Sequence, residues 1–195
     1  MKKYFAIVSS IVLFIAGGSE ATLIDFSTFE SDPSGTAKVG PDSSSVTVYE
    51  DPSVMHVLFY NSSISIPADS MYLTFDYDFV EGFENDDDVN IYLYDPSDRA
   101  IMTRLRDANN NPFEVFLYSS GSGSVTWNLL GADFLGDSVG FEVDLNSWDL
   151  RTDSHIEVSN VNITPIPEPG TILLLTTGLL GIAGYGIRLR KKWKS

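Results

Sequence analysis

The chain has 195 residues, no cysteine and a formal net charge of −15 at pH 7. The lack of cysteine excludes disulfides, thiol catalysis and Cys-ligated metal sites. Residues 22–165 hold 25 of the 27 acidic side chains but five of the 12 basic ones, a formal charge of −20. Such a segment repels phosphate groups, which disfavours nucleic acid and anionic membrane surfaces as its partners, and we expect no nucleic acid to bind.

The amino terminus has the three parts of a secretory signal peptide. Lys2 and Lys3 precede an apolar run over residues 4–16, and Ser19-Glu20-Ala21 is a small-x-small cleavage site. The run is too short for a stable bilayer anchor, so we expect export by the Sec machinery and cleavage after Ala21. Residues 22–165 then form one exported domain, and an uncleaved amino-terminal anchor is the alternative.

Hydrophobic residues in this domain alternate with polar ones, which indicates half-buried strands. The expected strands cover residues 23–26, 46–49, 54–60, 64–66, 73–79, 89–93, 101–105, 113–118, 125–129, 139–145 and 156–163. No segment has a sustained helical stripe, and only residues 129–135 fit a turn of 3₁₀ helix. The Gly/Ser stretch at residues 121–124 predicts a flexible loop.

A change of phase in the closing strand predicts a β-bulge. Ile156 and Val158 share one face, whereas Val161 and Ile163 fall in the opposite phase. One extra residue near Asn160 would return all four side chains to one face.

Short strands joined by Pro, Gly, Asn and Asp turns predict an all-β fold, an antiparallel β-sandwich. The spacing of residues 73–77, 139–143 and the closing 160–163 resembles the jelly-roll modules of the galactose-binding and carbohydrate-binding type. This resemblance implies a jelly-roll-like domain and leaves its function open, because sandwiches host many functions.

Acidic residues between two expected strands offer oxygen ligands, which Ca²⁺ prefers. The resemblance implies that a structural Ca²⁺ can lie at a loop edge, and the candidate ligands are Glu84, Asp86, Asp88 and Asp95. No Asp-x-Asp-x-Asp-Gly loop is present. Solvated loop carboxylates are therefore the favoured interpretation, and no cofactor is required.

Sugar binding needs an aromatic ring that is open to solvent and has polar groups beside it. The candidates are Trp148, Tyr49, Tyr60, Tyr92 and Tyr94. Trp148, Tyr92 and Tyr94 are preferred, and the last two fall on the strand face opposite Val89 and Leu93. Trp127 alternates with apolar neighbours and is expected in the core.

Catalysis has weaker support. Carboxylates are so frequent here that any pair could be nominated for a glycosidase. A serine triad needs a histidine base, but His56 lies in a strand expected to be buried and His155 at an edge. We expect no enzyme, and a secreted polysaccharide- or ester-acting hydrolase is the alternative.

The carboxyl terminus, residues 166–195, combines a proline-flanked acid, an uncharged span and a basic cluster. No charged side chain occurs between Glu168 and Arg188. A helix over these residues, about 170–187, approaches the roughly 30 Å hydrocarbon thickness of a bilayer. The basic cluster that follows, residues 188–195, is predicted to stay in the cytoplasm and leave the main domain outside. It contains Arg188, Arg190, Lys191, Lys192 and Lys194.

Pro167-Glu168-Pro169, the Leu/Gly-rich span and the Arg/Lys tail together resemble the PEP-CTERM sorting signal of Gram-negative bacteria. In that family the signal is recognised by exosortase, a membrane-embedded cysteine peptidase. The resemblance implies exosortase as the processing partner. It also implies an association with exopolysaccharide-producing bacteria.

These features predict an exported protein that is anchored in the inner membrane with its main domain in the periplasm. Sorting to the cell surface or an extracellular biofilm matrix would follow. The expected role there is structural or carbohydrate-binding. A permanently membrane-anchored periplasmic protein is the other alternative.

Overall fold

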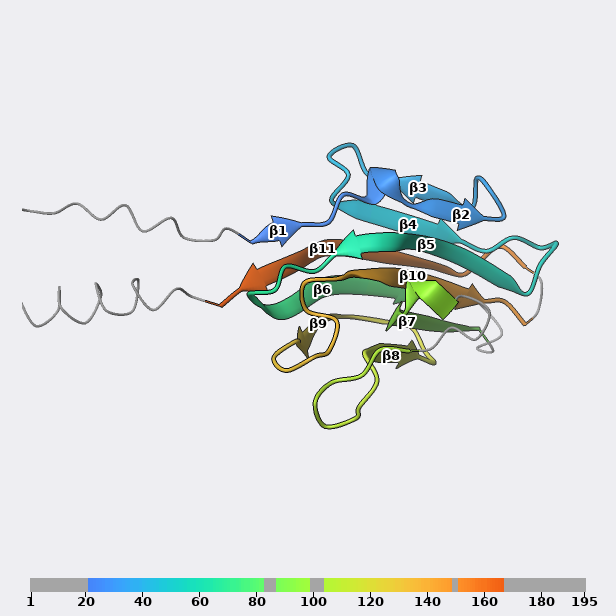
Figure 1. Ribbon diagram of the computed structural model, residues 1–195. Helices are drawn as coiled ribbons and strands as arrows, with labels where there is room; N and C mark the ends of the chain where they lie inside the picture. Colours follow the sequence, from blue (N-terminus) through green and yellow to red (C-terminus); the bar gives the residue numbers. More distant parts are fainter. Residues whose placement is uncertain (1–20, 83–86, 99–103, 149–150, 167–195) are drawn as a thin grey trace, which may run out of the picture. The chain divides into compact units, whose positions relative to one another are not determined.

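The computed structural model describes residues 21–82, 87–98, 104–148 and 151–166, which form two antiparallel β-sheets without an α-helix (Figure 1). The all-β expectation is confirmed for these ranges. The expected signal peptide before residue 21, the Pro-Glu-Pro motif, the apolar span and the basic cluster lie outside them. Within the described ranges, no helix is long and apolar enough to cross a bilayer.

The six-stranded sheet has the order β3-β4-β11-β6-β9, and β1 pairs with β11. Its strands are β1 (Thr22–Leu23), β3 (Ala37–Val39), β4 (Ser45–Tyr49), β6 (Ser70–Val80), β9 (Gly121–Asn128) and β11 (His155–Pro165). A short 3₁₀ helix, η1 (Phe26–Thr28), follows β1.

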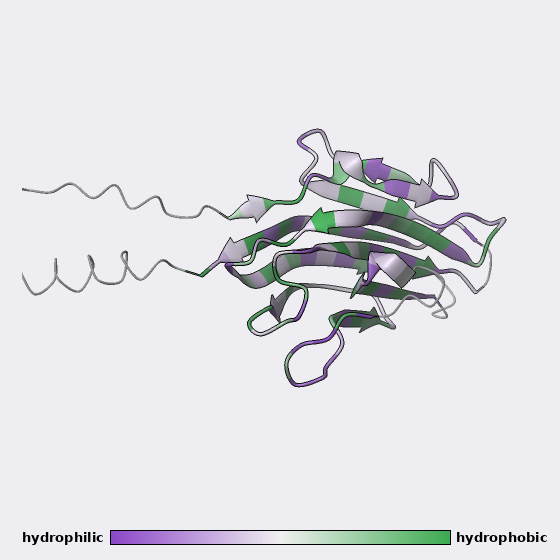
Figure 2. Cartoon of the chain, viewed as in Figure 1, coloured by the Kyte–Doolittle hydropathy of each residue, from purple (hydrophilic) through white to green (hydrophobic). Residues whose placement is uncertain are grey.

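The five-stranded sheet has the order β2-β5-β10-β7-β8. Its strands are β2 (Glu30–Asp32), β5 (His56–Ser65), β7 (Asp88–Tyr94), β8 (Glu114–Leu117) and β10 (Ser138–Asn146), and η2 (Pro96–Asp98) follows β7. Figure 2 shows hydrophobic and hydrophilic residues alternating along these strands, as the period of two predicts.

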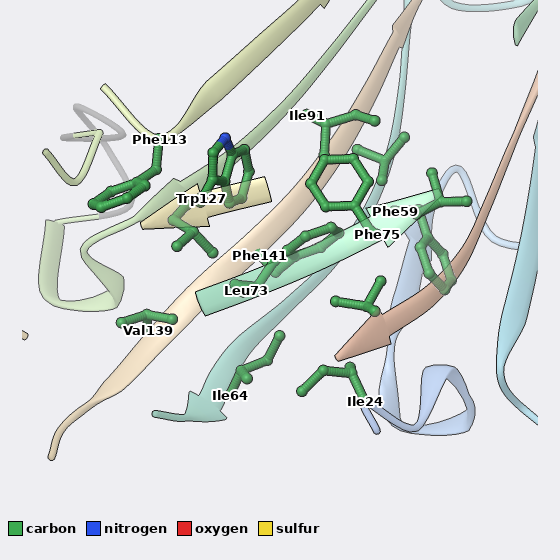
Figure 3. Close-up of a cluster of buried hydrophobic side chains, with 14 of the residues drawn as sticks. Ile24, Phe59, Ile64, Leu73, Phe75, Ile91, Phe113, Trp127, Val139 and Phe141 are labelled. Carbon is green, nitrogen blue, oxygen red and sulfur yellow. The ribbon is translucent and has the colours of Figure 1, made fainter. Parts of the chain in front are cut away.

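One hydrophobic core joins the inner faces of the two sheets. Phe75 of β6 lies edge-on to Trp127 of β9, with ring centroids 5.1 Å apart, and edge-on to Phe141 of β10 at 6.0 Å (Figure 3). Such edge-to-face contacts add to the burial of apolar area. The expectation that Trp127 belongs to the core is confirmed.

The predicted bulge in β11 is confirmed. Ser159 pairs with Asp76 and Asn162 pairs with Thr74, so β11 holds one residue more than β6 between these pairs. Asn160 takes a positive φ of 54°, a conformation that asparagine tolerates better than most residues. The extra residue returns Val161 and Ile163 to the core face, where both are buried.

Two local expectations are wrong. Residues 121–124 form the start of β9, paired with β6 from Asp76 to Phe79, rather than a loop. A Cβ at Gly123 would lie 3.0 Å from the Tyr77 hydroxyl oxygen, so this glycine lets the ring lie across the strand. Residues 129–135 form separate hydrogen-bonded turns, such as Ala132 N–H to the Leu129 carbonyl, rather than a 3₁₀ helix.

Candidate functional site

The side of the five-stranded sheet that turns away from the core, called here the outer face, carries polar and aromatic side chains. On β10 and β7, Asp144 lies opposite Asn90, Asn146 opposite Asp88, and Glu142 opposite Tyr92. The alternating residues Val143, Leu145, Val89 and Ile91 are buried in the core. Strand alternation therefore places the polar set together on the other side of the sheet.

Trp148, just after β10, presents an open aromatic ring at one end of this outer face. Its side chain is 53% exposed. The backbone N–H donates to Oδ1 of Asp87 at 3.1 Å, and the indole Nε1–H donates to Oδ2 of Asp88 at 3.2 Å. Asn146 donates to the other Asp88 oxygen at 2.6 Å. Two consecutive aspartates thus hold the ring in place beside a polar strand surface.

Asp144 occupies the middle of the outer face, with its side chain 17% exposed. His56, at the start of β5, lies opposite Asn146 and diagonal to Asp144, with Nδ1 3.4 Å from Oδ1 of Asp144. Burial raises the pKa of Asp144, and the charge of Asp88 adds to the rise, whereas His56 and Arg104 lower it. The sequence placed His56 in a buried part of its strand, but the side chain is exposed.

Tyr92 and Tyr94 do lie on the outer face, but they are 1% and 0% exposed, which corrects the expectation that they stack on sugars. The Arg104 guanidinium lies over the Tyr92 ring, with Cζ 4.7 Å from the centroid, and the Tyr92 hydroxyl donates to buried Glu142. Burial and this hydrogen bond raise the pKa of Tyr92. The Tyr94 ring packs over Gly140, where any Cβ would overlap it. Neither ring offers a face to a ligand.

Two other aromatic rings, which the sequence did not single out, are exposed beside this surface. Phe116 of β8 lies opposite Asn90, so it shares the outer face, and Tyr118 follows two residues later. Their rings stack at 5.8 Å with an interplanar angle of 7°, and Tyr118 is 70% exposed. Period-two spacing from Glu114 was the only sequence signal, and it does not say which face of β8 meets solvent.

Arg104 and Glu114 link the aromatic pair to the strands. Arg104 Nε lies 2.8 Å from Oε1 of Glu114, and Asn90 Nδ2 donates to the same oxygen at 2.9 Å. The Arg104 guanidinium also lies 5.8 Å from the centroid of Phe116. Among the described residues, Arg104 is therefore the one arginine near the centre of the outer face, and a carboxylate and two aromatic rings contact it.

A cavity of about 920 Å³ adjoins the far end of the outer face, around η2, the 104–110 segment and the 133–139 turn. Its charged lining residues are Asp95, Asp107, Asp133, Asp137, Arg104 and Arg106. Asp95 accepts the Ser97 N–H at 2.8 Å and Asp107 accepts the Asn111 N–H at 2.8 Å. These hydrogen bonds lower the pKa values of both aspartates. Both carboxylates therefore stabilise the turns in which they lie.

A buried carboxyl pair lies behind Trp148. Ser154 joins the pair, because its N–H donates to Glu50 at 2.7 Å and its hydroxyl donates to Asp87 at 2.6 Å. Burial raises the pKa of Glu50 to about 7, and the neighbouring Asp87 charge adds to the rise. Glu50 thus tends to keep a proton near neutral pH, while Asp87 supports the Trp148 backbone.

The four residues nominated for Ca²⁺ do not form one site. Glu84 and Asp86 lie outside the described residues. Asp88 and Asp95 stand at opposite ends of β7, roughly 20 Å apart at about 3.3 Å per residue. In the part of the chain that the structure describes, no three His, Cys, Asp or Glu side chains are arranged to hold a metal ion.

Comparison with known protein families identifies a motif at the carboxyl terminus. Residues 165–191 match the PEP-CTERM protein-sorting motif. The chain therefore carries this motif, which indicates an exported protein that is processed at the membrane. No curated protein matches the chain.

Solved structures that resemble the domain include carbohydrate-binding modules. TmCBM61 in complex with β-1,4-galactotriose is 12% identical over 73% of this chain and 91% of its own, with a TM-score of 0.45. The carboxyl-terminal CBM6 of LamC from Zobellia galactanivorans is 12% identical over 72% and 99%, with a TM-score of 0.37. The agarase AgWH50C is 10% identical over 76% and 26%, with a TM-score of 0.44. At such scores the likenesses carry no argument about function, which depends on the residues of the outer face.

Proposed function

We propose that this chain is an exported protein, sorted by exosortase to the cell envelope or the extracellular matrix, where its domain binds carbohydrate without cleaving it. The binding surface is the outer face of β5, β10, β7 and β8. The jelly-roll-like domain is delivered by a signal peptide and held by the carboxyl-terminal span until it is processed.

One observation carries the binding function: Trp148 is exposed and yet fixed by Asp87 and Asp88 next to a polar sheet surface. A pyranose ring has apolar C–H faces and a rim of hydroxyl groups. The indole supplies a flat apolar surface for the first, and the carboxylates and amides of β7 and β10 supply hydrogen-bond partners for the second. Because hydrogen bonds already hold the ring, its side chain loses little conformational entropy when a sugar binds.

The open geometry favours binding over hydrolysis. A glycosidase needs one carboxyl group as acid and a second at a set distance across the scissile bond. Asp144 has the raised pKa of an acid, but it lies 3.4 Å from His56 on an extended sheet surface. Its carboxylate neighbour Asp88 is occupied by the donors of Asn146 and Trp148.

Binding is tested with the full chain, purified in detergent micelles, by affinity electrophoresis in gels that contain soluble polysaccharides. At least one polysaccharide should retard the wild type, and Trp148→Ala should lose at least tenfold in affinity. Val80→Ala, which shortens an exposed side chain of the other sheet, is the matched control and should bind as the wild type does. Retardation that is equal for all three proteins contradicts the proposed surface. Sugar release from the same polysaccharides would contradict the non-catalytic role.

Sorting is tested in an exosortase-containing host. Alanine at Pro167, Glu168 and Pro169 together should leave an unprocessed precursor in the membrane fraction, whereas the wild type reaches the surface or the medium without Ser195. Mass spectrometry of the mature carboxyl terminus reads the outcome. A wild-type protein that keeps Ser195 in the membrane would instead identify a permanently anchored periplasmic protein.

A further inference from the structure

Resting on the proposed carbohydrate-binding function, we propose that the outer face selects sugars that carry an ammonium group, such as glucosamine units, over uronic acids. The selecting group is a block of four side chains, Asp144 and Asn146 on β10 and Asp88 and Asn90 on β7, called here the acceptor block. Its members are cross-strand pairs, so their side chains are immediate neighbours.

Each amide of the acceptor block already donates one of its two hydrogens to a carboxylate. Asn90 Nδ2 donates to Glu114 at 2.9 Å, and Asn146 Nδ2 donates to Asp88 at 2.6 Å. Carboxylates only accept hydrogen bonds, which fixes the orientation of both amides. Each amide therefore turns its nitrogen towards a carboxylate and leaves its oxygen for another partner.

Both amide oxygens lack that partner. Among the described residues, Oδ1 of Asn90 and Oδ1 of Asn146 are buried and accept no hydrogen bond, and the two residues are themselves more than nine-tenths buried. A buried acceptor without a donor is costly, so the site favours a ligand that brings donors. With the two carboxylate oxygens of Asp144, the free acceptors of the block outnumber the one N–H left on each amide. An ammonium group has three donors and a positive charge, whereas a uronate carboxylate has neither.

The cations near the block have partners of their own. Arg104 is engaged by Glu114 and by the rings of Tyr92 and Phe116. His56 faces Asp144, and its contribution depends on its protonation. In the described ranges Lys38 lies over Tyr49 of the other sheet, and Arg106 donates to the Asn110 carbonyl. Arg151, three residues after Trp148, is exposed. An ammonium group entering beside Trp148 would meet both a negative potential and an indole face, which attracts cations.

The test compares β-1,4-linked hexasaccharides that differ at one substituent: glucosamine, N-acetylglucosamine, glucose and glucuronate. Isothermal titration with the full chain in detergent micelles should show the amine form binding at least tenfold tighter than the acetylated and neutral forms. The glucuronate form should bind most weakly. EDTA should leave these affinities unchanged, and an affinity that requires Ca²⁺ would overturn the proposal.

Two variants locate the selection in the acceptor block. Asp144→Asn, which keeps the side-chain shape, should reduce the preference for the amine at least fivefold. His56→Lys, at an exposed position, should do the same by placing a fixed cation beside Asp144. Glu157→Gln, an exposed residue of β11 on the other sheet, removes the same charge and should leave the preference intact. An equal loss in Glu157→Gln would overturn the proposal, because net charge would then explain the preference.

The outcomes separate this inference from the function on which it rests. Equal binding of amine, acetylated and neutral forms, or preferred binding of glucuronate, overturns the ammonium selection and leaves carbohydrate binding in place. Failure to bind any of these sugars or any polysaccharide in the affinity gels overturns the carbohydrate-binding function itself.

Discussion

The indole Nε1 of Trp148 lies 3.2 Å from Oδ2 of Asp88, which joins the second residue after β10 to the first residue of β7. The exposed ring and the acidic strand end are therefore one structural unit. Asp88 also accepts Asn146 at 2.6 Å, so its removal breaks two contacts of the proposed binding surface.

Asp88→Ala should release the Trp148 ring without unfolding the domain. The exposed indole N–H can turn to water, but the buried Asn146 amide loses its acceptor, with an expected cost of about 1–3 kcal/mol. We expect a glycan affinity at least tenfold lower and a faster acrylamide quenching of tryptophan fluorescence. Asp69→Ala, at an exposed position outside this surface, is the control. Unchanged affinity and quenching in Asp88→Ala would argue against this role of Asp88.

The buried Glu50 should make stability fall as pH rises. Its pKa is about 7 in the folded protein and 4.5 ordinarily, so the unfolded chain releases this proton first. The stabilising contribution is complete below about pH 4.5 and is lost as pH rises through about 7. Glu50→Gln imitates the protonated form and should flatten this part of the curve. Thermal unfolding of both proteins between pH 4 and 9 measures it, and parallel curves would contradict the assignment.

The bulge in β11 should depend on the left-handed conformation of Asn160. Asn160→Val places a β-branched residue at a φ of 54° and should cost roughly 1–3 kcal/mol of unfolding free energy. It also removes the 2.9 Å hydrogen bond from Asn160 to Asp76. Asn160→Gly loses that bond but keeps the backbone conformation, so it should be less destabilised. Urea unfolding of the two variants would contradict this account if Gly and Val were equally destabilising.

The centre of the core should be sensitive to truncation. Phe75 is 1% exposed and contacts Trp127 and Phe141 edge-on. Phe75→Ala should therefore cost about 3–5 kcal/mol, the usual range for a buried phenylalanine. Chemical unfolding measures this loss, and a cost below about 1 kcal/mol would show that the two sheets pack less closely than described.

The sequence predicted those parts of the fold that depend on strand periodicity. The phase change between Val158 and Val161 required one extra residue, and the bulge supplies it. Trp127 alternated with Val125 and Leu129, and its ring lies in the core. Both inferences use local spacing, which the pleat of a strand converts directly into a choice of face.

The spacing of residues along a strand does not predict whether a side chain on the outer face is covered by another part of the chain. Tyr92 and Tyr94 lie on the predicted side of β7, but a distant arginine, Arg104, covers one ring and Gly140 accommodates the other. Phe116 and Tyr118 have similar spacing, yet they are 45% and 70% exposed. The difference is tertiary, and so is the register that brings Asp144 opposite Asn90.

Hydroxyl-radical footprinting of the full chain with saturating glycan tests the binding surface most directly. Bound glycan should lower the oxidation of Trp148 and His56, while Tyr72 on the other sheet and core residue Trp127 keep their rates. Protection confined to the six-stranded sheet, or no protection of Trp148 at saturation, would contradict the account.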